Sequence, residues 1–247
     1  MDANDSSASP TRRRFFRTLG AIPVAVAALP GCSDRPAHGV PSTPGAPTQE
    51  AKTPYRATFF HPDEWAFIVA AADRLIPSDD VGPGAVELGV PEFLDRHMNT
   101  PYAAGDIWYM QGPFVEAGKE FGYQGPLPLR DILRVGIKAF DTYCRQHHDG
   151  KAFADLDREL QNKLLSDADN AKITFPDIPA KAFFDYFLNE VRYGYFADPS
   201  YGGNRDMGAW KAIAYPGVRA EFLDWVTVRD KPYPLGPVDL SGRRASA

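Results

Sequence analysis

Hydrophobic positions recur every three or four residues over much of the chain from Tyr55 onward, which is the spacing of an amphipathic helix. The first such stretch opens at Pro62, a residue that the first turn of a helix tolerates, and it stops at Pro77. Its apolar positions are Trp65, Ile68, Val69, Ala72, Leu75 and Ile76. The pattern therefore predicts a helix that begins near Pro62 and ends before Pro77.

Similar patterns predict helices along the rest of the chain. They are expected over residues 93–98, over Asp106–Phe121 with a break or kink at Gly112-Pro113, over Pro128–His148, after an N-cap at Asp157, and from Pro179 through Tyr195. No segment alternates apolar and polar residues as a half-buried strand does, and the chain has no internal repeat. We therefore predict an all-α fold, with a single compact multi-helix domain and long loops over residues 55–229.

The N-terminal residues carry an export signal. Arg12 and Arg13 precede Phe15 and Phe16, an order that matches the twin-arginine address of bacterial export. The apolar run over 19–30 is far shorter than the roughly 20 residues that span a bilayer, so it is typical of a signal peptide. We predict a twin-arginine signal peptide over residues 1–31. Because that route carries folded proteins, the signal hints at a second polypeptide that travels with this chain.

The end of the signal allows two interpretations. Leu29-Pro30-Gly31-Cys32 resembles a lipoprotein cleavage box with Cys32 as the lipidated residue, whereas Ala25-Val26-Ala27 offers ordinary cleavage. Residues 32–54 are rich in Pro, Ser and Thr and predict a flexible linker. Prolines also interrupt residues 230–247, which predicts an extended or disordered tail.

Charge and cysteine content narrow the function classes. The formal net charge is −5, and removal of residues 1–31, with four arginines and two aspartates, makes it −7. No basic cluster remains outside the signal, which argues against nucleic acid as a partner. After Cys32 only Cys144 remains, so no disulfide is expected within the domain.

A search for catalytic, cofactor-binding and metal-binding motifs is negative. Gly82-Pro83-Gly84 starts like a dinucleotide loop but follows no strand and lacks the third glycine, so it predicts a turn. There is no haem attachment motif, no phosphate loop and no nucleophile elbow. The adjacent His147 and His148 point about 100° apart on a helix and cannot chelate one ion together. We predict no catalytic, cofactor or metal residue in this chain.

Two clusters of large or conformationally special residues stand out instead. Trp108–Phe114 places four large side chains around a helix break, and consecutive helical residues cannot all face one core. The second cluster, Tyr201–Asp206 with Trp210, combines a double glycine with Asn and Arg. Core filling and a plain structured turn are the alternatives. The predicted partner-interface residues are Trp108, Tyr109, Met110, Gln111, Tyr201, Gly202, Gly203, Asn204, Arg205, Asp206 and Trp210.

Short motifs in a fixed order resemble those of subunit 3, the small subunit of gluconate 2-dehydrogenase and related membrane-bound sugar dehydrogenases. The resemblance covers about residues 55–226. The motifs are Phe60-His61-Pro62-Asp63-Glu64-Trp65, Asp73-Arg74-Leu75-Ile76-Pro77, Gly82-Pro83-Gly84-Ala85, Gly89-Val90-Pro91-Glu92-Phe93, Trp108–Phe114 and Asp198–Met207.

The resemblance implies an accessory role for this chain. In such complexes a large FAD-containing subunit of the glucose–methanol–choline oxidoreductase type oxidises the sugar or sugar acid, and a cytochrome c subunit with haem c passes electrons to quinone. The small subunit carries the export signal, assists maturation of the flavoprotein and escorts it to the periplasm, where the complex associates with the inner membrane. Gluconate is the expected substrate, although fructose and sorbitol dehydrogenases have comparable small subunits.

Two rival functions remain on the sequence alone. The chain could be an independent lipid-anchored periplasmic binding protein, with the aromatic clusters forming its own ligand groove. A stand-alone enzyme is the weaker rival, because no acid–base or nucleophile constellation is visible.

Overall fold

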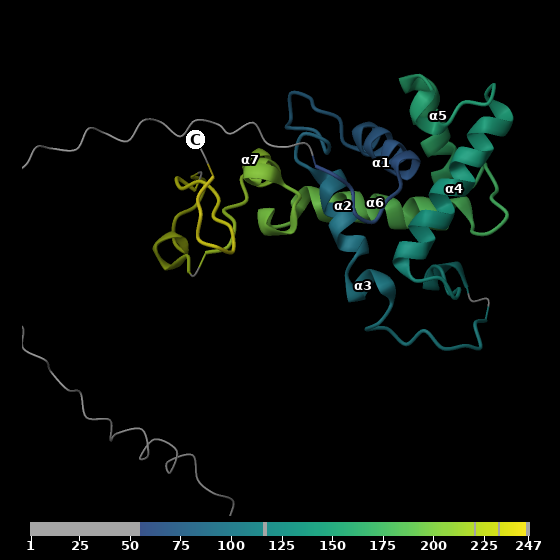
Figure 1. Ribbon diagram of the computed structural model, residues 1–247. Coiled ribbons are helices and arrows are strands. Elements are labelled where there is room, and N and C mark those ends of the chain that lie inside the picture. The colour runs from purple at the N-terminus through teal and green to yellow at the C-terminus, as the bar shows by residue number, and fades with distance from the viewer. Residues whose placement is uncertain (1–54, 116–117, 220, 232, 246–247) are drawn as a thin grey trace, which may run out of the picture. The chain divides into compact units, whose positions relative to one another are not determined.

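The computed structural model describes residues 55–115, 118–219, 221–231 and 233–245 (Figure 1). The predicted signal residues Arg12, Arg13, Phe15 and Phe16, the candidate lipidation residue Cys32 and the linker 32–54 lie outside these ranges.

The described residues are helical, with no extended strand, which confirms the predicted all-α class for this part of the chain. Two isolated β-bridges, Gly217 to Val238 and Val238 to Arg244, are the extended pairings. The α-helices are α1 (Pro62–Leu75), α2 (Val90–Met98), α3 (Pro101–Ala104), α4 (Leu129–His147), α5 (Arg158–Asp169), α6 (Ala180–Phe196) and α7 (Gly208–Ala212). None of the described helices is long and apolar enough to cross a bilayer.

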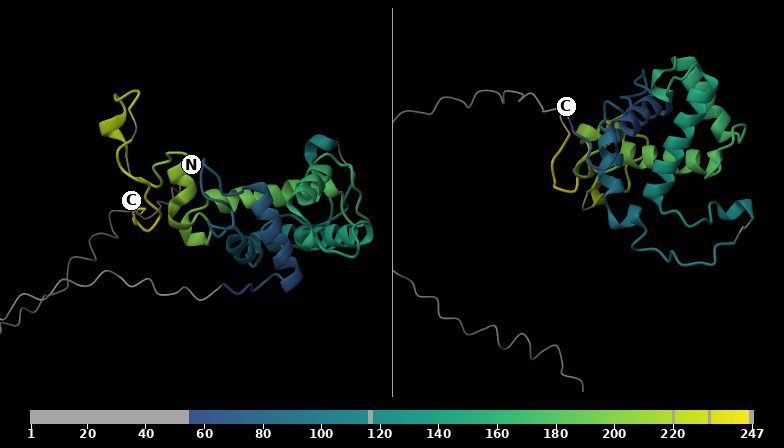
Figure 2. Two further views of the ribbon diagram at one scale, coloured as in Figure 1. Left: turned by 90° about the horizontal axis from the view of Figure 1, so that it is seen from above. Right: turned by 45° about the vertical axis from the view of Figure 1, so that its right-hand side comes forward.

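Helix α6 is the centre of the packing, because it contacts α1, α2, α4, α5 and α7 (Figures 1 and 2). The core around it is dominated by phenylalanine rings. Gly136 of α4 allows the two longest helices to approach, since a Cβ there would lie 2.0 Å from the Phe183 ring of α6. The largest fully buried aromatic side chains are Phe67, Phe140, Phe153, Phe183 and Phe187.

Local signals at the helix ends explain why several boundaries were predictable. Helix α1 begins at Pro62, and the Glu64 side chain accepts a hydrogen bond from His61 N at 2.8 Å. Helix α5 begins after Asp157, whose side chain accepts from Leu160 N at 2.9 Å. Helix α6 follows Pro179, as predicted. All three helices therefore begin where the sequence predicted.

The helix predicted over Asp106–Phe121 is wrong. Helix α3 ends at Ala104, before this stretch, and Gly105 adopts a left-handed conformation with φ 82° that terminates it. The described residues that follow, 106–115 and 118–121, are irregular apart from a short 3₁₀ turn at Lys119–Phe121. Pro113 supplies no backbone N–H, and Ile107, Trp108 and Tyr109 are consecutive apolar residues with no helical period. The stretch is therefore a loop.

A buried carboxylate joins the start of the domain to α2. Asp95 is fully buried, and its two oxygens accept five hydrogen bonds from the segment that precedes α1. Burial by itself raises the pKa of this carboxyl, but the backbone N–H donors of Phe60, Thr58 and Phe59 outweigh burial and lower it. The donors are Tyr55 Oη, Thr58 N and Thr58 Oγ1 at 2.8 Å, Phe59 N at 2.9 Å and Phe60 N at 3.0 Å.

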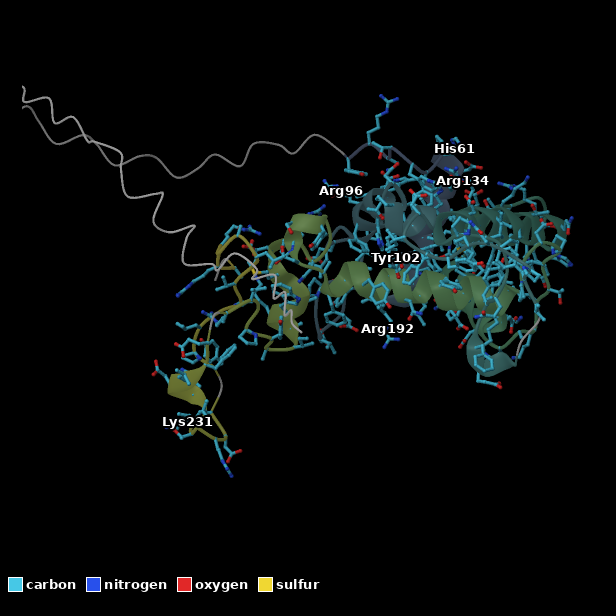
Figure 3. All side chains as sticks on the ribbon, turned by 90° about the horizontal axis from the view of Figure 1, so that it is seen from below. His61, Arg96, Tyr102, Arg134, Arg192 and Lys231 are labelled. Atoms are coloured by element: carbon cyan, nitrogen blue, oxygen red, sulfur yellow. The ribbon has the colours of Figure 1, made fainter. Side chains whose placement is uncertain are left out.

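Helix α4 holds the same segment from its other side. Arg134 Nε donates to Glu64 Oε1 at 3.1 Å, and Arg134 Nη2 donates to Phe59 O at 2.7 Å. Its guanidinium lies 4.1 Å from the centre of the Phe59 ring. Figure 3 labels Arg134 beside His61, the N-cap of α1. Residues 55–61 are thus tied to α1, α2 and α4 before the first helix begins.

Cys144 lies on the core face of α4 and is fully buried. Burial, and then the nearby Asp141 carboxylate, raise the pKa of its thiol to about 12. The thiol therefore stays protonated at neutral pH and acts as a core side chain, because the thiolate is the reactive form.

Candidate partner interface

The loop after α3 presents large apolar side chains to solvent. Trp108 is 53% exposed and Tyr109 is 83% exposed, and the neighbouring Ile107, Phe114 and Val115 are also exposed. Residues 107–115 contain no Asp, Glu, Lys, Arg or His. Core filling therefore does not describe this cluster, because most of its apolar surface faces water. We call residues 107–115 the apolar loop.

A ladder of stacked rings supports Trp108 from the core. Its ring meets the Tyr102 ring edge to face at 5.4 Å between centroids, and Tyr102 stacks on His97 at 5.2 Å. His97 in turn lies 5.2 Å from Phe93, a buried residue of α2. The ladder fixes the position of the exposed indole relative to α2.

The ladder is also bound to α6 through one polar contact. His97 Nδ1 lies 2.7 Å from Glu190 Oε2, and Glu190 is buried on α6. Burial, and then the Glu190 carboxylate, raise the pKa of the Tyr102 phenol, so Tyr102 stays neutral. Figure 3 shows Tyr102 against α6, and the labelled Arg192 of the same helix extends away from it into solvent.

Met110 and Gln111 complete the first cluster. Met110 is half-buried and lies over Gly105, where a Cβ would be 3.3 Å from Met110 Cγ and 3.1 Å from Pro128 Cβ. Gln111 is exposed. Met110 therefore packs the apolar loop against the end of α3, next to the start of α4. The residues on either side of Met110 remain accessible to a partner.

The double glycine of the second cluster is needed for packing within the chain. A Cβ at Gly203 would lie 2.0 Å from the Gly194 carbonyl oxygen of α6. Gly202 has φ 105°, and a Cβ there would lie 3.0 Å from Arg96 Nη1 of α2. Only glycine lets this loop approach the two helices so closely.

Asn204 and Trp210 bind the loop to the end of α6. Asn204 is fully buried, donates through Nδ2 to Ala197 O at 2.9 Å and accepts from Ala209 N at 2.9 Å. Trp210 is buried and its Nε1 donates to Phe196 O, also at 2.9 Å. These two side chains satisfy backbone groups where α6 ends and α7 begins.

Arg205 reaches across to the segment before and within α2. Its backbone N donates to Leu88 O at 3.1 Å, and its guanidinium donates to Glu87 O at 3.0 Å and to Glu92 Oε1 at 2.7 Å. The arginine thus orders the loop.

The backbone of this loop is conformationally strained. Asn204, Asp206 and Met207 all have φ between 43° and 55°, in the left-handed region that non-glycine residues seldom adopt. Asp206 also forms an ion pair with Lys211 at 3.1 Å. The buried contacts of Asn204 and Met207 hold the strained conformation in place.

Part of the predicted interface is therefore internal. Gly203, Asn204 and Trp210 are buried against the chain's own helices, whereas Tyr201 is 58% exposed and Gly202, Arg205 and Asp206 are partly exposed. In the second cluster, only Tyr201, Gly202, Arg205 and Asp206 are accessible to a partner. In the first cluster, the accessible residues are those of the apolar loop.

Helix α2 connects the two clusters through adjacent residues. Arg96 lies against Gly202, and His97 supports the ladder to Trp108. The sequence analysis overlooked this role of Phe93, His97 and Tyr102, because His97 has no histidine or cysteine partner near it in the sequence. The motif Gly89–Phe93 drew attention to the start of α2, but the motif ends before His97 and so did not indicate its role.

Two hollows on the described surface have volumes of about 230 Å³ and about 620 Å³. The smaller lies between Trp210 and the 233–237 segment, and the larger lies between residues 78–88 and 205–212. Neither is lined by Trp108–Phe114. Among the described residues, no three His, Cys, Asp or Glu side chains are grouped so that they could hold a metal ion.

Comparison with known proteins gives one match. The family model described as gluconate 2-dehydrogenase subunit 3 matches residues 62–217, a stretch that contains both clusters and all seven described α-helices. No curated protein and no solved structure matches the chain.

Proposed function

The chain belongs to the gluconate 2-dehydrogenase subunit 3 family, as the order of its motifs predicted, and from this premise we propose that it is a non-catalytic small subunit of an FAD-dependent dehydrogenase complex. Its direct partner in this proposal is a large flavoprotein subunit of the glucose–methanol–choline oxidoreductase type, and a cytochrome c subunit receives the electrons. FAD and haem c are assigned to those partners. Gluconate is the proposed substrate of the complex.

The observation that carries this proposal is the apolar loop on the surface of the folded domain. Exposed Trp, Tyr and Phe side chains in a run without charge are typical of a protein interface, and single soluble domains seldom present such a patch without a partner. The ring ladder holds Trp108 in place before any partner binds, so association does not have to order it. The domain is therefore well suited to bind a large subunit.

The predicted twin-arginine signal supports a role in export. A chain that binds a flavoprotein through a preformed surface can do so in the cytoplasm, where FAD is inserted. The signal peptide would then direct the folded pair through the twin-arginine route to the periplasm. In this proposal the chain assists maturation of the flavoprotein, and the complex stays associated with the inner membrane. Lipidation of Cys32 would add an anchor of its own.

The rival function, an independent lipid-anchored binding protein, requires the aromatic clusters to enclose a ligand. Trp108 and Tyr109 lie exposed on the surface, whereas small-molecule sites are concave, and neither of the two hollows named above is lined by Trp108–Phe114. No observation favours this rival over the accessory subunit.

We expect the double substitution Trp108→Ala/Tyr109→Ala to weaken binding of the flavoprotein and to leave the thermal stability of the free chain almost unchanged. Truncation of an interface hot spot typically costs about 2 kcal/mol or more, which corresponds to a roughly thirtyfold loss of affinity. Both side chains are more than half exposed, so their removal opens no cavity in the core. The measurements are thermal unfolding of the isolated chain and retention of the flavoprotein by a tagged chain.

The matched control for this experiment is Val81→Ala. Val81 is 81% exposed on the turn between α1 and α2, and its truncation is expected to change neither measurement. Trp108→Ala/Tyr109→Ala could instead lower the melting temperature strongly and leave flavoprotein retention per folded chain unchanged. That result would show that both residues stabilise the fold and do not bind the partner.

A further inference from the structure

The C-terminal loop, defined here as the described residues 218–219, 221–231 and 233–238, is closed at its base. Val218 N donates to Val238 O at 2.7 Å, and Val238 N donates to Pro216 O at 3.3 Å. Gly217 has φ 73°, and a Cβ there would lie only 2.2 Å from Val238 O. A larger residue at this position would push the two ends of the loop apart. The two hydrogen bonds and the glycine therefore hold the two ends of the loop together.

A small aromatic cluster stabilises the interior of this loop. Tyr233 packs edge to face against Phe222 at 5.7 Å and Trp225 at 5.3 Å between ring centroids. The Arg219 guanidinium lies 5.0 Å from the centre of the Tyr233 ring and donates to Gly236 O. These contacts join the outgoing and returning limbs, so the loop has a defined conformation.

Two aliphatic side chains of the same loop point the other way, into solvent. Leu223 opens the 3₁₀ turn Leu223–Trp225 and is 76% exposed, and Val226, three residues later, is 72% exposed. Residues three apart in a 3₁₀ turn lie on one face, so Leu223 and Val226 form an apolar ridge. Figure 1 shows the yellow C-terminal segment beyond the labelled α7, and Figure 3 labels Lys231 within this segment.

Folding of the domain does not account for this ridge. Among the described residues, the buried hydrophobic core ends at Trp210, and none of its members belongs to the C-terminal loop. The family match also ends at residue 217, at the base of the loop. The loop therefore lies after the residues that the family model matches, and it exposes apolar surface that the domain core does not use.

The charges of the C-terminal loop distinguish between kinds of partner. A loop that binds an anionic bilayer carries an excess of Lys and Arg, whereas a protein interface surrounds apolar anchors with polar residues of both signs. Here the signs balance, with three basic and three acidic side chains, namely Arg219, Arg229, Lys231, Glu221, Asp224 and Asp230. This balance of charges favours a protein over an anionic bilayer as the partner of the loop.

The base of the loop is fastened to the second predicted cluster. Leu240 N, just after the loop, donates to Asp198 Oδ2 at 2.7 Å. The other oxygen of Asp198 accepts from Ser200 N at 3.0 Å and caps the 3₁₀ turn that ends at the exposed Tyr201. The segment that follows the C-terminal loop is therefore bound next to the 3₁₀ turn that ends at Tyr201.

We propose that the C-terminal loop is a second docking element for the flavoprotein subunit, with Leu223 and Val226 as its apolar anchors. This inference rests on the proposed function and adds to it a contact outside the matched residues 62–217. The closed base and the aromatic cluster hold the ridge in a binding conformation before the partner arrives, which reduces the entropy lost on association.

The test is Leu223→Asp/Val226→Asp in the full chain, expressed together with the flavoprotein subunit. We expect retention of the flavoprotein to fall at least about tenfold, because a charge would be buried at each anchor of the interface. The melting temperature of the free chain is expected to stay unchanged, because both positions are exposed. Val81→Asp is the control, since it places the same charge on another exposed valine and should retain the flavoprotein fully.

The outcomes separate this inference from the proposed function. Full retention by Leu223→Asp/Val226→Asp, together with loss by Trp108→Ala/Tyr109→Ala, overturns the docking role of the loop and leaves the proposed function intact. Failure of the unaltered chain to retain any flavoprotein overturns both. Retained flavoprotein with lost membrane association, or with a changed oligomeric state, assigns the ridge to lipid or to a second copy and also overturns the inference. If the aspartates lower the melting temperature, Leu223→Ser/Val226→Ser makes the same comparison.

Discussion

Replacement of Arg12 and Arg13 by lysine is expected to leave both this chain and the dehydrogenase activity of its partner in the cytoplasm. The export receptor reads an arginine pair, and lysine keeps the charge but not the planar guanidinium with its fixed donors. In the proposed complex the flavoprotein has no other route across the membrane, so its activity should disappear from the periplasmic fraction. The measurement is dehydrogenase activity and chain content in both fractions.

Arg14→Lys is the matched control for this experiment, because Arg14 occupies the variable position after the pair. It should export the activity normally. Periplasmic activity that is unchanged when Arg12 and Arg13 are both lysine contradicts the escort role. If this chain stays in the cytoplasm while the dehydrogenase activity is still exported, the flavoprotein has its own export signal.

Substitution of Asp95 is expected to be the most destabilising single change in the described domain. Asp95→Ala removes the acceptor of five hydrogen bonds and leaves three backbone N–H groups without their partner in a buried site. Breaking such a buried, charge-assisted network typically costs about 3–5 kcal/mol of unfolding free energy. Chemical denaturation of the isolated chain measures the loss, and the exposed Asp80→Ala serves as the control.

Asp95 should also shape the acid stability of the domain. Because folding lowers the pKa of this carboxyl, the ionised form contributes stability above the ordinary carboxyl pKa, and that stability is lost as the pH falls from there through the lowered pKa. Asp95→Asn removes the titration, so its stability should fall less steeply with acid in this range than that of the unaltered chain. Equal slopes for the two proteins would show that the network does not depend on the charge.

The parts of the fold that were predictable are those that depend on local signals. Helices α1, α5 and α6 have a proline or an aspartate at their start and an apolar face at regular spacing, and both features are readable in the sequence. The loop over 106–121 failed as a helix because Gly105 ends α3 and the apolar residues that follow are consecutive. Local propensity could not show that this run is a surface patch.

The contacts that organise the candidate interface join residues far apart in the sequence. Arg205 binds Glu92 across 113 positions, and His97 meets Glu190 across 93. Whether Arg205 orders its own loop or contacts a partner therefore depends on where α2 lies, which no periodicity in the 201–210 segment reveals. The ring ladder below Trp108 likewise exists only once α2, α3 and α6 have packed together.

Affinity purification of the tagged full-length chain from its native membranes shows whether this chain is the accessory subunit of a flavin dehydrogenase. We expect a larger subunit with flavin absorbance to co-purify with dehydrogenase activity, and the chain purified alone to show neither flavin nor haem absorbance and no turnover. A chain that purifies without a flavoprotein, or that shows a bound chromophore or catalyses the oxidation by itself, would contradict the account.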